Sequence, residues 1–360
     1  MRSADRRNGS MTTSLLSVAT AVPENAVTQK TIAEAAGQAF GGRYSEFGRL
    51  SRVFETAGID QRHLARPVEW YLRPRDWAER NGAYVETARD LFVAAAERAL
   101  ARAGVAAAEI DTVVTISSTG LATPSLEAQV AGRMGFRSDI ERVPVFGLGC
   151  AGGVSGLSIA ARLAEARPGS TILMVAVELC SLAFRLDELT KANIVATALF
   201  ADGAAACVLK SDDMGALHVE AAGRHTWPDT LSIMGWRVDP EGLGVIFDRA
   251  IPPFVEEKLK PALEGILAAA DLTLGDIDRL VCHPGGTKVL EALETALALP
   301  SGRLDHERAV LADYGNMSAP TVLFVLERLL AEGEPPARLL LTALGPGFTA
   351  SGVTLKRSPH

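Results

Sequence analysis

The sequence lacks the marks of several large protein classes. Its 360 residues contain four cysteines, none in a CxxC pair, and six histidines without metal-ligand spacing. We therefore expect no disulfide framework, no bound metal and a reducing, cytoplasmic location. No apolar run approaches the ~18 residues of a transmembrane segment. Lys and Arg form no long block in a chain of net charge −7, which argues against nucleic acid as a partner.

The composition is that of a folded globular protein. Hydrophobic residues make up 48% and charged residues 22% of the chain, which is long enough for one large core or two fused ones. The opening residues MRSADRRNGS are polar and have no apolar stretch of the kind found in signal peptides. We expect residues 1–12 to be a disordered extension, and Met1 and Met11 are both candidates for the native start.

The order of predicted elements repeats along the chain. Apolar spacing predicts helices at 83–103 and 255–270, and β-branched or apolar runs predict strands at 108–120, 166–178, 200–210 and 275–286. Asp111 and Asp278 precede similar strands at an offset of 167, and Cys150 and Asn316 begin similar segments at an offset of 166. This predicts a duplication, with chance similarity as the alternative. The α/β halves would be 13–213 and 214–360.

Cys150 lies in the glycine-rich stretch FGLGCAGGVSGL (146–157). At a helix start, free N–H groups and a nearby imidazolium lower the pKa of a thiol, and the thiolate is a nucleophile. Small neighbours such as Gly152 and Gly153 would leave space for an acyl group on the sulfur. The alternative is a buried structural cysteine beside a tight turn.

His283 and Asn316 are the other candidates for catalysis. His283 follows a predicted strand in CHPGG, and Asn316 starts an apolar helix in YGNMSAP. A twofold relation between the halves would bring Asn316 close to Cys150. Donors facing a thioester carbonyl would stabilise the enolate left after decarboxylation. Alternatively, His283 is a core residue and Asn316 a helix N-cap.

The motifs GCAGG, ALFADGAA, HPGG, YGNMS and GPGF occur in an order and spacing that resemble type III polyketide synthases, over roughly 13–357. The resemblance implies a thiolase-like layered αβαβα fold built from two duplicated halves, and a homodimer. It also implies an acyltransferase that uses an acyl-CoA starter and malonyl-CoA, without a metal or organic cofactor.

The resemblance also implies residue roles. Cys150 would be acylated by the starter, and His283 and Asn316 would bind malonyl-CoA and promote its decarboxylation. Phe200 would be a gatekeeper, with a core aromatic as the alternative, and the position of a second gatekeeper falls at Val245. Further pocket positions are Ser118, Thr119, Thr123, Ala183, Ser318, Gly345, Pro346 and Gly347. Thr123-Pro124 matches a place where family members often have a cis-proline.

Contacts with CoA are expected where cations could meet its phosphates. The resemblance places Arg49, Arg52 and Arg62 there, with a solvated basic face as the alternative, and adds Gly285 and Gly286 beside the histidine.

A medium- or long-chain fatty acyl starter is our substrate prediction. Ala183 leaves volume for a chain, and the stretches STGLATPSLEA, FRLDELTKAN and HPGGTKVLEALE resemble alkylpyrone or alkylresorcinol synthases. One rival is a β-ketoacyl synthase III-type enzyme that performs a single condensation. The other is a non-catalytic thiolase-fold acyl-CoA binder. Starter length, the number of extensions and aldol or lactone closure are not encoded in any single residue.

Overall fold

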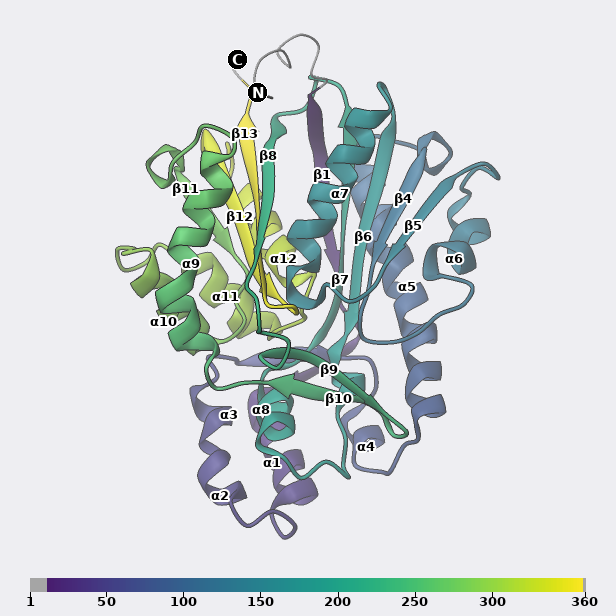
Figure 1. The fold of residues 1–360 in the computed structure, drawn as a ribbon. Helices are drawn as coiled ribbons and strands as arrows, with labels where there is room; N and C mark the ends of the chain where they lie inside the picture. Colours follow the sequence, from purple (N-terminus) through teal and green to yellow (C-terminus); the bar gives the residue numbers. More distant parts are fainter. Residues whose placement is uncertain (1–11, 359–360) are drawn as a thin grey trace.

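A nine-stranded mixed sheet runs through the computed structural model, which describes residues 12–358 (Figure 1). The strand order is β11-β12-β13-β8-β1-β7-β6-β4-β5. The bounds are β1 Thr13–Ala21, β4 Thr112–Ile116, β5 Glu141–Val145, β6 Thr171–Leu179, β7 Asp202–Ser211, β8 Leu217–Thr226, β11 Arg279–Cys282, β12 Arg338–Gly345 and β13 Thr349–Arg357. The predicted extension 1–12 lies outside the described residues except for its last position.

Counted outward from the central β8–β1 pair, the two halves have equivalent strands in the same order, apart from the extra edge strand β5. The series β4-β6-β7-β1 of the first half corresponds to β11-β12-β13-β8 of the second, with the same sequence of parallel and antiparallel pairs. β4 and β11 begin 167 residues apart, as do β6 and β12. This confirms the predicted α/β fold of two similar halves. The predicted boundary at 213/214 falls in the link between β7 and β8.

Two central helices lie between the halves: α7 (Gly152–Ala166) and α12 (Thr321–Leu330). The strands of the two halves are joined into one sheet where Thr13–Leu15 of β1 pairs with Leu217–Val219 of β8. Beyond that point α7 and α12 contact strands of both halves and each other. This gives the middle layer of the predicted five-layer stack.

Outer helices complete the layers (Figure 1). α5 (Trp77–Ala103) and α6 (Leu126–Met134) cover the first half, and α9 (Ile251–Ala268) and α10 (Thr287–Ala296) lie on the second. α5 begins with a capping box in which Asp76 Oδ1 accepts the Glu79 N–H, and it ends at Gly104 with φ 65°. The helices predicted at 83–103 and 255–270 are thus confirmed as α5 and α9.

Short elements gather at one end of the sheet, at the bottom of Figure 1. They are α1 Gln29–Phe40, α2 Phe47–Leu50, α3 Arg52–Thr56, α4 Val68–Tyr71, α8 Lys191–Leu199, the pair β2 Asn25–Thr28 and β3 Gln61–Leu64, and the hairpin β9 Met234–Asp239 with β10 Gly242–Phe247. α11 (Asp305–Tyr314) precedes Asn316.

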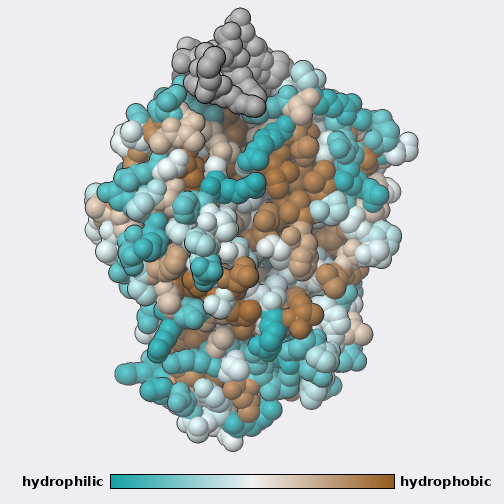
Figure 2. Space-filling model, in the orientation of Figure 1, coloured by the Kyte–Doolittle hydropathy of each residue, from teal (hydrophilic) through white to brown (hydrophobic). Residues whose placement is uncertain are grey.

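One face of the molecule is markedly hydrophobic. Figure 2 shows this area over α7 and the neighbouring β6. Ile159 and Leu163 of α7 and Val143 and Val145 of β5 are only partly buried there. No helix within residues 12–358 is both long and apolar enough to cross a membrane.

Candidate active site

Cys150 lies in a 3-10 turn, Gly149–Ala151, that leads directly into α7. Its side chain is 9% exposed, and Ser318 of the other half forms a hydrogen bond with it. Burial raises the pKa of the Cys150 thiol to about 11. The thiol is therefore protonated at neutral pH, and the expectation of a lowered pKa is wrong for this geometry.

The glycines after Cys150 serve the packing of helices. A Cβ on Gly153 would lie 2.3 Å from the carbonyl oxygen of Ala319, and one on Gly152 would lie 2.7 Å from Ile116. The idea that these glycines clear space for an acyl group is therefore wrong: they let α7 approach the start of α12. Gly149 has a different constraint, with φ 47° and Pro346 Cδ 2.7 Å from its ideal Cβ position.

His283 follows the last residue of β11, and its N–H donates to Thr342 O at 2.9 Å. Its ring is buried, and neither Nδ1 nor Nε2 has a partner among the described residues. Burial lowers the pKa of His283 to about 4, so the ring is neutral at pH 7. Two unpaired nitrogens in a buried ring are unusual for a core histidine and leave both free for a substrate.

Asn316 is held between the two halves. Its N–H donates to Leu199 O and its carbonyl accepts from Ala201 N, both at 2.9 Å. In the side chain, Nδ2 donates to Gly285 O at 3.1 Å and Oδ1 accepts the Ser318 N–H at 2.8 Å. α12 begins at Thr321, so Asn316 is not its N-cap. These bonds fix which way the amide points.

Cys150, His283 and Asn316 line one cavity, which we call the histidine cavity. Met234, Phe247, Gly285 and Ala343 also line it. Cys150 also borders a second space, the serine cavity. The serine cavity is lined by the predicted residues Ser118, Thr119, Phe200, Val245, Ser318 and Pro346, together with Cys180 and Trp236. The structure thus brings the three candidates and most of the predicted pocket together around one sulfur.

An apolar cavity adjoins the serine cavity. It shares Cys180, Phe200 and Val245 with that space. Ala183 lines it, along with Ile32, Leu64, Val68, Tyr71, Phe184 and other residues. Ala183 therefore lies one chamber away from Cys150, behind Phe200, rather than beside the sulfur.

The hairpin β9–β10 forms a wall common to these spaces. Trp236 pairs with Val245 across the hairpin, and the Trp236 ring packs edge-on against Phe200 at 6.3 Å between centroids. Met234 and Phe247 line both the histidine and the serine cavity. Val245 was predicted as a pocket residue, but Met234, Trp236 and Phe247 were missed, although the apolar residues in GLGVIF were a signal for the strand.

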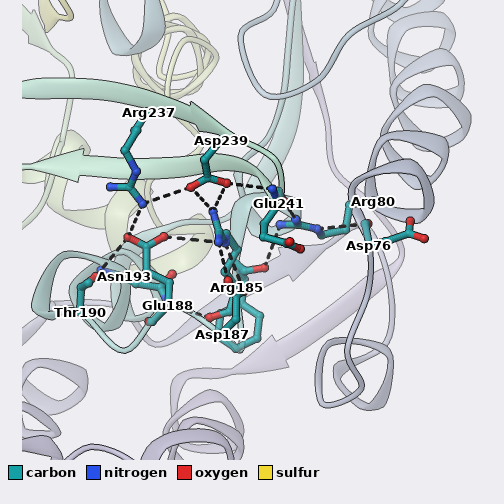
Figure 3. A network of polar contacts seen from close by, with 11 residues as sticks. Asp76, Arg80, Arg185, Asp187, Glu188, Thr190, Asn193, Arg237, Asp239 and Glu241 are labelled. Atoms are coloured by element: carbon teal, nitrogen blue, oxygen red, sulfur yellow. Dashed lines mark hydrogen bonds and ion pairs between the residues drawn. The ribbon is translucent and has the colours of Figure 1, made fainter.

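A buried arginine fixes the turn of that hairpin (Figure 3). Arg185 is 6% exposed, and its Nη1 donates to both carboxylate oxygens of Asp239 at 2.8 Å. Arg237 of β9 in turn donates to Glu188 at 3.2 Å. Arg80 of α5 donates to the carbonyl of Glu241 in the turn. Charge-assisted hydrogen bonds of this kind fix orientation, so they hold the turn of the β9–β10 hairpin from outside the cavities.

Three predicted pocket residues take other positions. Thr123 is exposed and lines none of the three cavities. The Thr123-Pro124 bond is cis, as the resemblance implied. Gly345 packs on the turn that carries Cys150, with its ideal Cβ 2.5 Å from Leu148 O, and Gly347 has φ 117°. Both glycines thus support the loop around Pro346.

The predicted CoA contacts divide into three groups. Arg49 and Arg52 are exposed, and Arg49 forms an ion pair with Glu46. Gly285 lines the histidine cavity and Gly286 precedes α10. Arg62 is 1% exposed, and its guanidinium donates to the carbonyls of α8 residues and of Phe200. A surface role for Arg62 is therefore wrong, because its donors cap the C-terminus of α8.

A further acidic residue lies behind the site. Glu178 is fully buried, and its Oε2 accepts from Ser118 N at 2.9 Å and from Thr119 Oγ1 at 2.8 Å. Burial raises the pKa of Glu178 to about 8. It was missed because a lone Glu at the end of an apolar run resembles an ordinary surface residue. In the described part of the chain, no three His, Cys, Asp or Glu side chains gather as a metal site would require.

Comparisons with known proteins agree over the whole chain. Residues 1–213 match the family model for the N-terminal domain of chalcone and stilbene synthases, and residues 218–359 match that of the C-terminal domain. A 1,3,6,8-tetrahydroxynaphthalene synthase from Streptomyces peucetius subsp. caesius is 40% identical over 351 residues, covering 96% of this chain and 93% of the relative. A putative chalcone synthase from Bacillus subtilis (strain 168) is 34% identical, covering 93% and 96%.

Solved structures give the same result. The crystal structure of 1,3,6,8-tetrahydroxynaphthalene synthase from Streptomyces coelicolor A3(2), described as a bacterial type III polyketide synthase, has a TM-score of 0.91 at 30% identity. The match covers 96% of this chain and all of the other. The layered arrangement described above is therefore shared along its full length.

Proposed function

This chain belongs to the chalcone and stilbene synthase family and is a type III polyketide synthase with the thiolase-like fold, and we propose that it extends an acyl-CoA starter with malonyl-CoA. The observation that carries the proposal is the histidine cavity, where a cysteine, a histidine with two unpaired ring nitrogens and an oriented asparagine amide meet. No further cofactor is proposed, because Cys150 can carry the covalent intermediate.

Acyl transfer is the first proposed step. Cys150 Sγ attacks the thioester carbonyl of the starter, a new C–S bond forms, and the CoA thiolate leaves. Because the pKa of Cys150 is about 11, its proton has to leave as the new bond forms. The neutral ring of His283 lies in the same cavity and is placed to accept that proton.

Decarboxylation is the second proposed step. The bond between the carboxylate and C2 of malonyl-CoA breaks, carbon dioxide leaves, and the electron pair forms an enolate. An N–H of His283 and the Nδ2 of Asn316 donate to the enolate oxygen, where a buried donor is worth more than in water. C2 then attacks the acyl group, and the Cys150 sulfur leaves. Repetition and closure of the chain give a cyclic product.

A medium- or long-chain fatty acyl starter is the proposed substrate, with an alkylpyrone or alkylresorcinol as product. The support is the apolar cavity beyond Phe200 and Val245, which could take a hydrocarbon tail while the thioester stays at Cys150. The second candidate product is 1,3,6,8-tetrahydroxynaphthalene, since a synthase with that name is 40% identical.

The test is product analysis by liquid chromatography and mass spectrometry, with malonyl-CoA and starters from acetyl to stearoyl and an aromatic acyl-CoA. Long-chain pyrones or resorcinols support the proposal. A naphthalene product from malonyl-CoA alone would replace the starter assignment. Ala183→Phe should fill the apolar cavity and remove long-chain products, whereas the matched Ala183→Ser should keep them. Linear products of one condensation would support the β-ketoacyl synthase III-type alternative. Binding without acylation of Cys150 would support the non-catalytic acyl-CoA binder.

A homodimer is also proposed. Leu121 and Phe146 are 54% and 55% exposed, and they border the same surface hollow. The hydrophobic face over α7 described above is large enough in Figure 2 to suggest that a partner covers it. Sedimentation should give twice the 38.0 kDa chain mass, and Phe146→Asp should shift it toward the monomer. A monomeric wild-type protein would refute this assembly.

A further inference from the structure

The strand that ends at His283 lies at the edge of the sheet. Within residues 12–358, β11 has a single strand neighbour, β12, and on that side the His283 N–H donates to Thr342 O. The N–H of Cys282, a fully buried residue, finds no strand on the open side. Glu307 of α11 takes the place of the missing strand, because its Oε1 accepts this N–H at 3.0 Å. An unpaired buried N–H is rare and costly, so this bond fixes the end of β11.

The other oxygen of Glu307 holds the start of the same strand. Oε2 accepts from Arg279 Nη2 at 3.0 Å, where Arg279 is 11% exposed and Glu307 is not exposed at all. One carboxylate thus accepts hydrogen bonds from residues at both ends of the short β11. Burying a charged pair is expensive, so a well-packed apolar pair would serve stability at least as well. The pair therefore calls for a role other than stability.

Glu307 also belongs to the segment that delivers Asn316. It lies in the first turn of α11, which ends at Tyr314, and Gly315 with φ 71° turns the chain into Asn316. Asn316 Nδ2 reaches across to Gly285 O in the loop after His283. The two loops are thus linked twice, once at the site and once at the carboxylate of Glu307.

We propose that Glu307 is a positioning residue that sets the spacing between His283 and Asn316 by tying α11 to β11. This inference rests on the proposed roles of His283 and Asn316 in stabilising the enolate. Donors act on such an oxygen only within a few tenths of an ångström of ~2.9 Å, and a shift of ~1 Å can cost about 10²-fold in rate. Acylation of Cys150 uses His283 alone, whereas the enolate oxygen needs His283 and Asn316 together, so acylation should depend less on this tie.

The test compares Glu307→Met, which keeps volume but has no acceptor oxygen, with Glu307→Gln, which keeps one. We expect kcat for malonyl-CoA decarboxylation to fall about 10-fold or more in Glu307→Met, with KM within about 3-fold of wild type and a smaller fall in the rate of Cys150 acylation. Glu307→Gln should restore most of kcat. Leu311→Ala is the control, because it removes a buried side chain from α11 without touching β11's bond to Glu307. It should lower Tm but keep kcat.

Several outcomes would overturn the inference. They are wild-type decarboxylation in Glu307→Met, an equal loss of Cys150 acylation, or an equal loss in Leu311→Ala. If Glu307→Met does not fold, the test uses the double variant Arg279→Met/Glu307→Met instead, because this variant leaves neither charge buried without its partner. Failure of the proposed function would appear as absent decarboxylation in the wild type. In that case hydrogen exchange of the backbone amides still tests the tie. Residues 279–286 should exchange faster in Glu307→Met than in Leu311→Ala, and equal exchange rates would refute the tie.

Discussion

Replacing Gly153 with alanine tests the contact between the two central helices. The new Cβ would lie 2.3 Å from Ala319 O and 2.9 Å from Val322 Cγ1, both belonging to the segment of α12. A backbone oxygen cannot rotate away, so α7 and α12 must separate. Overpacking costs about 1–3 kcal/mol, and the helix propensity of Ala returns up to ~1 kcal/mol. We expect a net loss of about 1 kcal/mol in the free energy of unfolding.

That loss can be measured against a matched control. Gly82 lies in α5, and a Cβ there would meet nothing within 4 Å, so Gly82→Ala should stabilise the protein by about 1 kcal/mol. With an unfolding entropy of about 2.1 cal/mol/K per residue, Tm should fall by ~1 °C in Gly153→Ala and rise by ~1 °C in the control. Denaturant titrations of both variants give the free energies. A Gly153→Ala protein as stable as Gly82→Ala would refute close helix packing as the reason for this glycine.

Three further predictions concern the site. Cys150→Ala should abolish condensation yet keep malonyl-CoA decarboxylation, whereas His283→Ala should lose both; full product from Cys150→Ala would refute the nucleophile. The rate of inactivation by iodoacetamide should rise about tenfold per pH unit from pH 7 toward 10, because burial raises the pKa of Cys150 to about 11. A rate that already reaches a plateau below pH 7 would show that an ion pair keeps Cys150 as a thiolate. The pKa of Glu178 is about 8 when folded against 4.5 ordinarily, so folding binds a proton and stability falls from pH 5 to 8. Glu178→Gln should flatten that fall in denaturant titrations at pH 5 and 8.5, and an unchanged slope would contradict it.

The duplication could be predicted from the sequence because its landmarks are local. Strands of similar composition recur at an offset of 167, and the structure places β4 and β11 at that same offset. The proximity of Cys150 to Asn316 followed from the duplication alone. The number of residues between similar motifs can be counted in the sequence, so this prediction does not depend on how the segments pack.

Other properties of the site depend on contacts between segments far apart in the chain. Arg62 reads as a surface cation, yet it is buried against α8, whose carbonyls compensate for the lost water. The glycines after Cys150 face α12, which begins about 170 residues later. The pKa of the thiol depends on its burial, which the residues next to Cys150 in the sequence do not indicate. The sequence therefore predicted the candidate groups, but it could not predict their protonation.

The mirrored strand order has a consequence for how this catalyst can change. In the proposed mechanism, one copy of the repeat carries the residue that holds the growing chain, and the other carries the pair that acts on malonyl-CoA. The two copies thus differ in their proposed roles, so substitutions in the first should alter what is loaded while the second continues to supply the same two-carbon unit.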